Sequence, residues 1–440
     1  MTGQWTAGDR YGLAFPADPA TLHSGAAGFL TDALRRSGVL GADNRVTRIA
    51  RFEPVAAGST GRKVVLTVEY DRAAPELHTD LFVKFSRDFD NPTRDLGRTQ
   101  MDAEVRFAGL SQLAKFPIAV PSVLFADYHR ETGTGLLITE RILFGTNGIE
   151  PHYQKCLDYD MPEPLEHYRA LLTALARLAG THRSGRLPAD LATDFPLDVA
   201  GATVGERAPL SPEKLDKRVT RLADFVAANP GLMPTGVHAP EFLDRLRTEV
   251  PLVARHADAV EQSLAADADY VALCHWNANV DNAWFWRDSP DGRGALRCGL
   301  MDWGCVSQMN VGMALWGALS GAETGLWDKH FDELLHVFVT EFRRCGGPPL
   351  DPDRLRRHTV LYAAVMGVAW LLDVPALLLS RFGDALPGNR TDPRIRDDES
   401  VRAPLQMLTN LLTVWERHRV GELLDDAQLG AFAAVRPRGG

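Results

Sequence analysis

A lysine and a glutamate are the first pair in this sequence whose types and positions indicate chemistry. Lys84 lies in the apolar stretch LFVKF, where an ammonium group without a partner would be unfavourable to bury. Glu104 follows in a stretch with helical periodicity. A carboxylate on that helix can pair with the lysine and direct its ammonium group toward the phosphates of a nucleotide. The alternative is an edge-strand lysine that points to solvent.

A glycine-rich segment comes before this lysine, with one strand between them. In AAGSTGRKVV, the residues Gly58, Ser59 and Gly61 would let a backbone turn approach phosphate oxygens closely. Turns of this composition also close ordinary β-hairpins. The segment alone therefore leaves both interpretations open.

Alternating apolar and polar residues predict the strands that would position these groups. Residues 46–55, 63–70 and 79–85 follow the two-residue period of an antiparallel meander. Residues 120–142 predict two more strands around a Gly-rich turn, and residues 101–115 predict a helix between the two sets. A helix at 27–38 is expected to pack on this first part of the chain.

The rest of the chain has mainly helical periodicity. Residues 164–185 place their apolar side chains along one stripe and predict a central helix. Strand character returns at 270–303, and most of the sequence from Met313 to about Phe432 reads as amphipathic helix. Residues 200–265 are polar and helical, with Pro and Gly breaks. The two parts together predict the α+β class.

Composition excludes several classes of protein. A chain of 440 residues, 45% hydrophobic and 24% charged, suits a soluble protein of two or three packed units. Its formal charge of −9 gives no overall attraction for nucleic acid or anionic lipid. The five cysteines lack paired spacing, and no signal peptide or spanning segment is recognisable. We expect a cytoplasmic protein without nucleic-acid or membrane partners, and oligomeric state is left open.

The most specific pattern is HWNANVDN, followed by two strands and MDW. Its His275, Asn277, Asn282 and Asp302 resemble, in order and spacing, two motifs of the aminoglycoside phosphotransferase and choline kinase superfamily. These are the loop H-G-D-x-x-x-x-N and the later I-D-W or I-D-F. With the stretches ALARLAGTHRSG, LFVKF and LLITERI, the resemblance spans roughly residues 45–320.

This resemblance implies the two-lobed protein kinase-like fold, with a small antiparallel-sheet N-lobe and a mostly helical C-lobe. The predicted domains are an N-terminal helical extension over 1–43, an N-lobe with the nucleotide-binding sheet over 44–144, and a C-lobe over 145–440. The C-lobe would carry the catalytic-loop and metal-binding motifs.

The resemblance also implies ATP and Mg²⁺ as cofactors. Asn282 and Asp302 would hold the Mg²⁺ ion against the phosphates, a task that suits hard oxygen ligands. Lys84, held by Glu104, would orient the phosphates beneath the glycine-rich turn.

Two further positions follow from the same resemblance. The stretch from Glu140 to Ile142 would be the hinge, whose backbone groups contact the adenine edge. His275 would support the catalytic loop by hydrogen bonding and take no part in the chemistry.

Asn277 stands where the family has its catalytic Asp. An amide cannot accept the proton of a substrate hydroxyl, so general-base help, worth about a hundredfold to ten-thousandfold, should be lost. Asn277 could still orient a hydroxyl, because phosphoryl transfer depends mainly on positioning and electrostatics. Asp281 is the nearest spare carboxylate, although its spacing places it toward the other side of the loop. Asn277, Asp281 and Asp302 are therefore the candidate catalytic residues.

The acceptor side of the motif also departs from the family. Gln308, Asn310 and Ala314 alter the usual acidic stretch after the MDW motif, so a small neutral or apolar alcohol is expected as acceptor and a polycation is not. Trp276 replaces a glycine of the loop, and its ring either forms part of an apolar pocket or fills the cleft.

Three functions stay open at this point. An ATP-dependent kinase of a small hydroxylated molecule is favoured by Lys84, Glu104, Asn282 and Asp302. A pseudokinase that binds a nucleotide or an apolar ligand, and acts as a sensor or binding module, is favoured by the altered loop. Transfer of the adenylyl group of ATP is the third.

Overall fold

The computed structural model describes residues 4–55, 58, 60–188, 190–197, 211–289 and 293–424. Contacts within the chain divide it into two compact units. The first comprises Met1–Ile149 and Gly299–Val306, and the second comprises Glu150–Cys298 and Ser307–Gly440. The domain boundaries taken from the sequence stay predictions, and Ser59 lies outside the described residues.

A five-stranded antiparallel sheet forms the centre of the first unit. In spatial order its strands are β3 (Val46–Val55), β4 (Arg62–Tyr70), β5 (Asp80–Phe85), β7 (Thr134–Glu140) and β6 (Val123–His129). Strands β3, β4 and β5 form the expected meander, and the hairpin β6–β7 adds to β5 through β7. The strands predicted from alternating apolar and polar residues therefore form one sheet.

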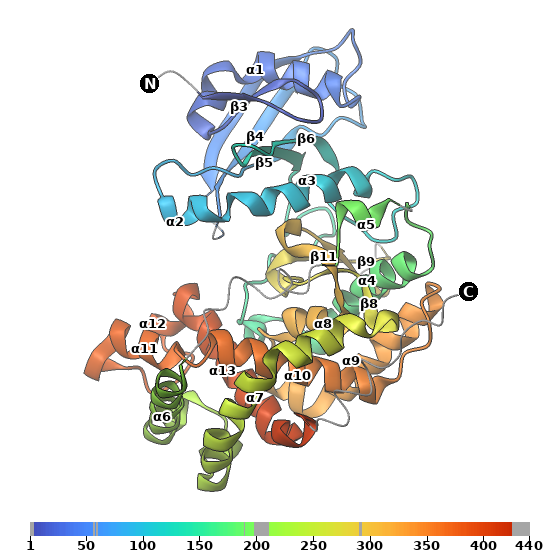
Figure 1. Ribbon diagram of the computed structural model, residues 1–440. Coiled ribbons are helices and arrows are strands. Elements are labelled where there is room, and N and C mark those ends of the chain that lie inside the picture. The colour runs from blue at the N-terminus through green and yellow to red at the C-terminus, as the bar shows by residue number, and fades with distance from the viewer. Residues whose placement is uncertain are drawn as a thin grey trace. The chain divides into compact units, whose positions relative to one another are not determined.

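Helices α1 (Pro19–Arg36) and α3 (Gln100–Ser111) cover opposite faces of this sheet (Figure 1). Leu30 of α1 belongs to the same core as Val64 and Val83. Leu137 of β7 packs in a second cluster with residues of α3. Neighbouring side chains along a strand point to opposite faces of the sheet. The residues next to Val64 along β4, and those next to Val83 along β5, therefore face α3.

Shorter elements complete the first unit. They are the hairpin of β1 (Trp5–Ala7) and β2 (Ala14–Pro16), the helix α2 (Pro92–Asp95), and the 3₁₀ turns η1 (Leu96–Thr99) and η7 (Trp303–Cys305). The β1–β2 hairpin was not expected, because three-residue strands are too short to show an alternating pattern.

The second unit is mostly helical. Its helices are α4 (Pro164–Arg183), α5 (Leu191–Asp194), α6 (Pro212–Ala228), α7 (Pro240–Ala266), α8 (Val311–Leu319), α9 (Thr324–Arg344), α10 (Pro352–Trp370), α11 (Val374–Phe382), α12 (Pro393–Arg396) and α13 (Glu399–His418). The predicted central helix α4 contacts α9, α8 and β8.

Two pairs of short strands carry the MDW region. β9 (Ala283–Arg287) pairs with β10 (Leu296–Leu300), and β8 (Val271–His275) pairs with β11 (Val306–Asn310). The first pair confirms the expected hairpin. Strand β11 is an addition to the prediction.

The α+β class, with a small antiparallel-sheet first unit and a mostly helical second unit, is confirmed. The five cysteines are free thiols, four of them buried. Among the described residues, no single helix has both the length and the apolar composition to cross a membrane; α10 taken together with Val374–Ala385 meets that test as a bent pair.

The turn between β3 and β4 lies against β5. Gly58 and Gly61 have φ angles of 74° and 53°, a region that favours glycine. A Cβ atom on Gly61 would lie 1.9 Å from the carbonyl oxygen of Phe85. Both the backbone angle and this close approach therefore require glycine at position 61.

We predict that Gly61→Ala lowers the free energy of unfolding by about 2–5 kcal/mol, from left-handed backbone strain and from overpacking. Gly12→Ala is the matched control, because Gly12 has a φ of 63° but, among the described residues, no neighbouring atom within 4 Å of where its Cβ atom would lie. That control should cost only about 1–2 kcal/mol. Equal losses in urea denaturation of the two variants would contradict the close approach.

Candidate functional site

The ammonium group of Lys84 lies between two carboxylates of the first unit. Its Nζ is 2.8 Å from Oε1 and 2.7 Å from Oε2 of Glu104, and 2.8 Å from Oδ1 of Asp302. Lys84 and Glu104 are only 8% and 5% exposed. The structure thus brings together three of the predicted site residues, and the alternative of a solvent-facing Lys84 is wrong.

Trp303, which the sequence analysis did not assign to the site, fixes Glu104 from the other side. Its backbone amide donates to Glu104 Oε1 over 3.2 Å. Its indole stacks on Phe107 of α3 with ring centroids 3.7 Å apart. Glu104 therefore accepts hydrogen bonds from a charged donor, Lys84, and from a neutral donor, the Trp303 amide. Both hold its side chain in place.

Asp302 has an unusual backbone. Its φ and ψ angles of 63° and 65° lie in the left-handed region, which non-glycine residues adopt uncommonly. Strained positions of this kind gather at functional sites. The side chain is 42% exposed, so it can reach a ligand while it contacts Lys84.

Charges at this site favour a protonated lysine. Burial acts to lower the pKa of Lys84, but Asp302 and Glu104 outweigh it and raise that pKa. Burial, together with the charge of Asp302, raises the pKa of Glu104 against the opposing effect of Lys84. The Lys84 ammonium group is thus hydrogen-bonded to two carboxylates, and both favour its charged form.

Arg94, a residue that sequence analysis did not single out, holds the glycine-rich turn from α2. Its guanidinium donates to the carbonyl oxygen of Gly58 over 2.8 Å, and to that of Gly61 over 2.7 and 3.2 Å. Arg94 Nε also lies 3.2 Å from Asp88 Oδ2. The turn is therefore tied to the segment that leads into α3.

Glu140, one of the residues of the predicted hinge, has hydrogen bonds to its main chain and its side chain. The amide of Glu140 donates to Ser122 O, and its carbonyl accepts from Thr139 Oγ1. Its carboxylate accepts from Ser122 at 2.8 and 2.9 Å. The contact of Glu140 and Ile142 with a nucleotide base stays a prediction.

The loop after β8 is held by amide side chains within the second unit. Asn277 Oδ1 accepts from Lys155 Nζ at 3.2 Å and from Asn279 Nδ2 at 2.7 Å. Asn282 Nδ2 donates to the Asn277 carbonyl at 2.8 Å. The side-chain oxygen of Asn277 is therefore surrounded by donors, and Lys155 is a cation that the sequence analysis missed.

Asp281 differs from its neighbours in this loop. Its Oδ1 is buried and has no hydrogen-bond partner among the described residues. Burial raises its pKa, and the nearby charge of Lys155 opposes this. A carboxylate of raised pKa suits a base, and the assignment of Asp281 as a displaced base stays a prediction.

His275 ends strand β8, and Trp276 follows it at the start of the loop. His275 is fully buried at the end of β8. The Trp276 indole donates to the Tyr362 hydroxyl at 2.8 Å, which anchors the ring on α10. A Cβ atom on Gly317 of α8 would lie 1.8 Å from the Trp276 carbonyl oxygen, so α8 packs tightly against this loop.

Mg²⁺ would find few protein ligands here. The described residues contain no group of three or more His, Cys, Asp or Glu side chains that could hold a metal ion. This fits an ion that takes one or two protein carboxylates and fills its remaining positions with water and phosphate. Asp302 belongs to the first unit and Asn282 to the second, so their joint use stays a prediction.

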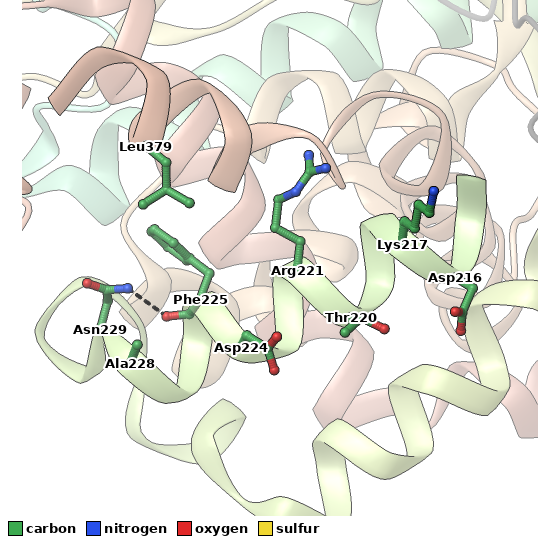
Figure 2. Close-up of a pocket in the computed structure, with 9 residues that line it drawn as sticks. All are labelled: Asp216, Lys217, Thr220, Arg221, Asp224, Phe225, Ala228, Asn229 and Leu379. Atoms are coloured by element: carbon green, nitrogen blue, oxygen red, sulfur yellow. Dashed lines mark hydrogen bonds between the residues drawn. The ribbon is translucent and has the colours of Figure 1, made fainter. Parts of the chain in front are cut away.

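An open hollow on α6 holds none of the predicted site residues. Figure 2 shows Phe225 of α6 facing Leu379 of α11, with Arg221 and Asp224 along the same helix. Arg221 lies 3.6 Å from Asp373, so its charge has a partner. We assign no chemistry to this hollow.

Comparison with known proteins gives similarity to solved structures. A choline/ethanolamine kinase family protein from Mesorhizobium loti is 16% identical, with 86% of this chain and 99% of that chain covered and a TM-score of 0.36. A microcompartment-associated aminopropanol kinase is 13% identical, with coverages of 84% and 93% and a TM-score of 0.40.

An aminoglycoside phosphotransferase from Alicyclobacillus acidocaldarius is 16% identical, with coverages of 86% and 92% and a TM-score of 0.38. No family model and no curated protein matches the chain. Similarity at this level does not by itself assign a function.

We predict that Lys84→Met lowers the free energy of unfolding by about 3–5 kcal/mol, because it leaves the Glu104 carboxylate buried without its cation. The double variant Lys84→Met/Glu104→Gln removes that charge and keeps an acceptor for the Trp303 amide. It should therefore regain a large part of the loss. A double variant no more stable than the single one, in urea denaturation followed by tryptophan fluorescence, would contradict the pairing.

Proposed function

We propose that this protein is an ATP-dependent phosphotransferase that acts on a hydroxyl group of a small molecule. The observation that carries the proposal is the buried Lys84 ammonium group, held by Glu104 and Asp302. This arrangement suits phosphoryl transfer, in which positioning and electrostatic stabilisation provide most of the catalysis.

The residues of the first unit would act on the nucleotide. Lys84 would bind phosphate oxygens, and Glu104 would keep its ammonium group charged and in place. The glycine-rich turn, tied down by Arg94, would cover the phosphates. Bound Mg²⁺, with oxygens of Asp302 and Asn282 as ligands, would supply neutralisation of phosphate charge.

The acceptor site is proposed to lie at the loop after β8. Asn277 would orient the acceptor hydroxyl, and Asp281 is the carboxylate within the loop that offers a base. Lys155 places a positive charge 3.2 Å from Asn277 Oδ1. That charge disfavours a cationic acceptor and agrees with a neutral alcohol.

A pseudokinase is the second candidate, and the contacts of Asn277 favour it. Its Oδ1 accepts from both Lys155 and Asn279, so the group at the position of the base is already satisfied within the protein. Such a protein would bind nucleotide and leave it intact.

The first test is calorimetry of ATP binding with and without Mg²⁺. We predict that the native protein binds ATP in a Mg²⁺-dependent way. In Asp302→Ala the affinity for ATP should fall by about tenfold or more, because a charged contact is lost. Asp43→Ala is the control, because it removes an exposed carboxylate of the first unit that pairs with Arg72. Nucleotide products are then separated from the same sample.

Each product distinguishes a function. ADP supports the phosphotransferase, unchanged ATP supports the pseudokinase, and pyrophosphate indicates adenylyl transfer. Absence of ATP binding by the folded native protein would overturn the nucleotide site itself.

A second prediction concerns the missing base. We expect Asn277→Asp to raise the rate of ADP formation by about a hundredfold, the lower range of general-base catalysis. Both donors to Asn277 Oδ1 can also donate to a carboxylate, so the loop should keep its structure. Asn389→Asp, which adds the same charge at an exposed position of the second unit, should leave the rate unchanged. An unchanged rate in Asn277→Asp would contradict its place beside the transferred phosphate.

A further inference from the structure

A second lysine of the sheet lies directly opposite Lys84. In the antiparallel register of β4 and β5, Lys63 pairs with Lys84. Both side chains occupy the face covered by α3, and Lys63 is 7% exposed. Directly opposite residues of such a pair have Cβ atoms about 4.5–5.5 Å apart. The two lysine side chains therefore leave the sheet next to each other.

The Lys63 ammonium group lies beneath the glycine-rich turn. A Cβ atom on Gly58 would be 2.2 Å from Lys63 Nζ, so the ammonium group lies directly against the backbone of this glycine. Nζ also donates to the carbonyl oxygen of Thr60 over 3.3 Å. The lysine thus reaches the part of the turn where phosphate oxygens are expected.

The charges around Lys63 are those of the nucleotide site. Burial lowers its pKa to about 8, and the positive charges of Lys84 and Arg94 act in the same direction. Asp302 and Glu104 act against this. Lys63 therefore shares an electrostatic environment with every charged residue that the proposed phosphate site uses.

An apolar residue would serve the packing of this position better. The following residues of β4, Val64, Val65 and Leu66, are buried and apolar. Two neighbouring ammonium groups repel one another, and Asp302 and Glu104 offset only part of this effect at Lys63, whose pKa stays lowered. A nucleotide triphosphate, which carries several negative charges along its length, would offset the remaining repulsion.

We propose that Lys63 is a second phosphate-binding residue, which forms with Lys84 a two-lysine cradle for the oligophosphate of the bound nucleotide. Lys84 binds one phosphate group, and Lys63 binds the phosphate covered by the turn at Gly58. This inference rests on the proposed function and adds a residue to its binding site. Its role is in affinity for phosphate and involves no proton transfer.

The test compares ATP with adenosine as calorimetric ligands of the full-length chain. Lys63→Met should weaken ATP binding by about tenfold to a hundredfold, as expected for loss of a charge-assisted contact. It should change adenosine binding less than twofold as an estimate, because adenosine has no phosphate. Lys63→Arg should keep ATP affinity within about threefold, since the positive charge is retained.

Arg62→Met is the matched control. It removes a cation from the adjacent position of the same strand, but Arg62 is exposed and pairs with Asp90 at 2.8 Å. ATP affinity should stay unchanged in this variant. If Lys63→Met does not fold, Lys63→Gln takes its place in the comparison of ATP with adenosine.

The outcomes separate this inference from the proposed function. Native protein that binds ATP in a Lys84-dependent way, with Lys63→Met indistinguishable from it, would overturn the cradle alone. Equal weakening of ATP and adenosine would assign Lys63 a structural role and also overturn it. A native protein that binds no ATP would overturn the proposed function and the inference with it.

Discussion

The burial of one ammonium group determines the arrangement of the first unit. Lys84 is almost fully enclosed, and such a charge is tolerated only with close partners of opposite charge. Glu104 comes from α3, and Asp302 comes from a segment that lies 218 residues later in the chain. The same ion pair therefore joins the sheet, the helix and a distant stretch of sequence.

Neutral contacts support this charged centre. The stack of Trp303 on Phe107 holds Gly299–Val306 against α3, and the Trp303 amide completes the coordination of Glu104. The backbone at Gly58 and Gly61 is likewise held by the protein itself, because Arg94 donates to the carbonyl oxygens of both residues. A site arranged in advance loses less conformational entropy when a ligand binds.

How much of this structure could be predicted from the sequence depended on how many residues each pattern spans. Strands β3, β4 and β5 are six to ten residues long, which is long enough for a strand pattern to show in the sequence. The three residues of β1 and of β2 show no period. A lysine within LFVKF contrasts with its apolar neighbours, which is why Lys84 and its partner Glu104 were found. Lys63 begins an apolar run and resembles an ordinary polar residue at a strand end.

Tertiary contacts account for the other residues that sequence did not predict. Only the register of β4 with β5 places Lys63 opposite Lys84. Lys155 lies 122 residues before Asn277 in the chain, and no local pattern connects the two. Pairwise contacts of this kind become visible only when the chain is folded.

The hydrogen bonds of Asn277 have a consequence for the history of this chain. Both contacts to its Oδ1 come from donors, Lys155 and Asn279, and an aspartate would satisfy them equally well. Asparagine and aspartate codons differ by a single base, and the two side chains have nearly the same shape. A lineage could therefore have passed between the amide and the carboxylate at this position, in either direction, without rebuilding the loop around it.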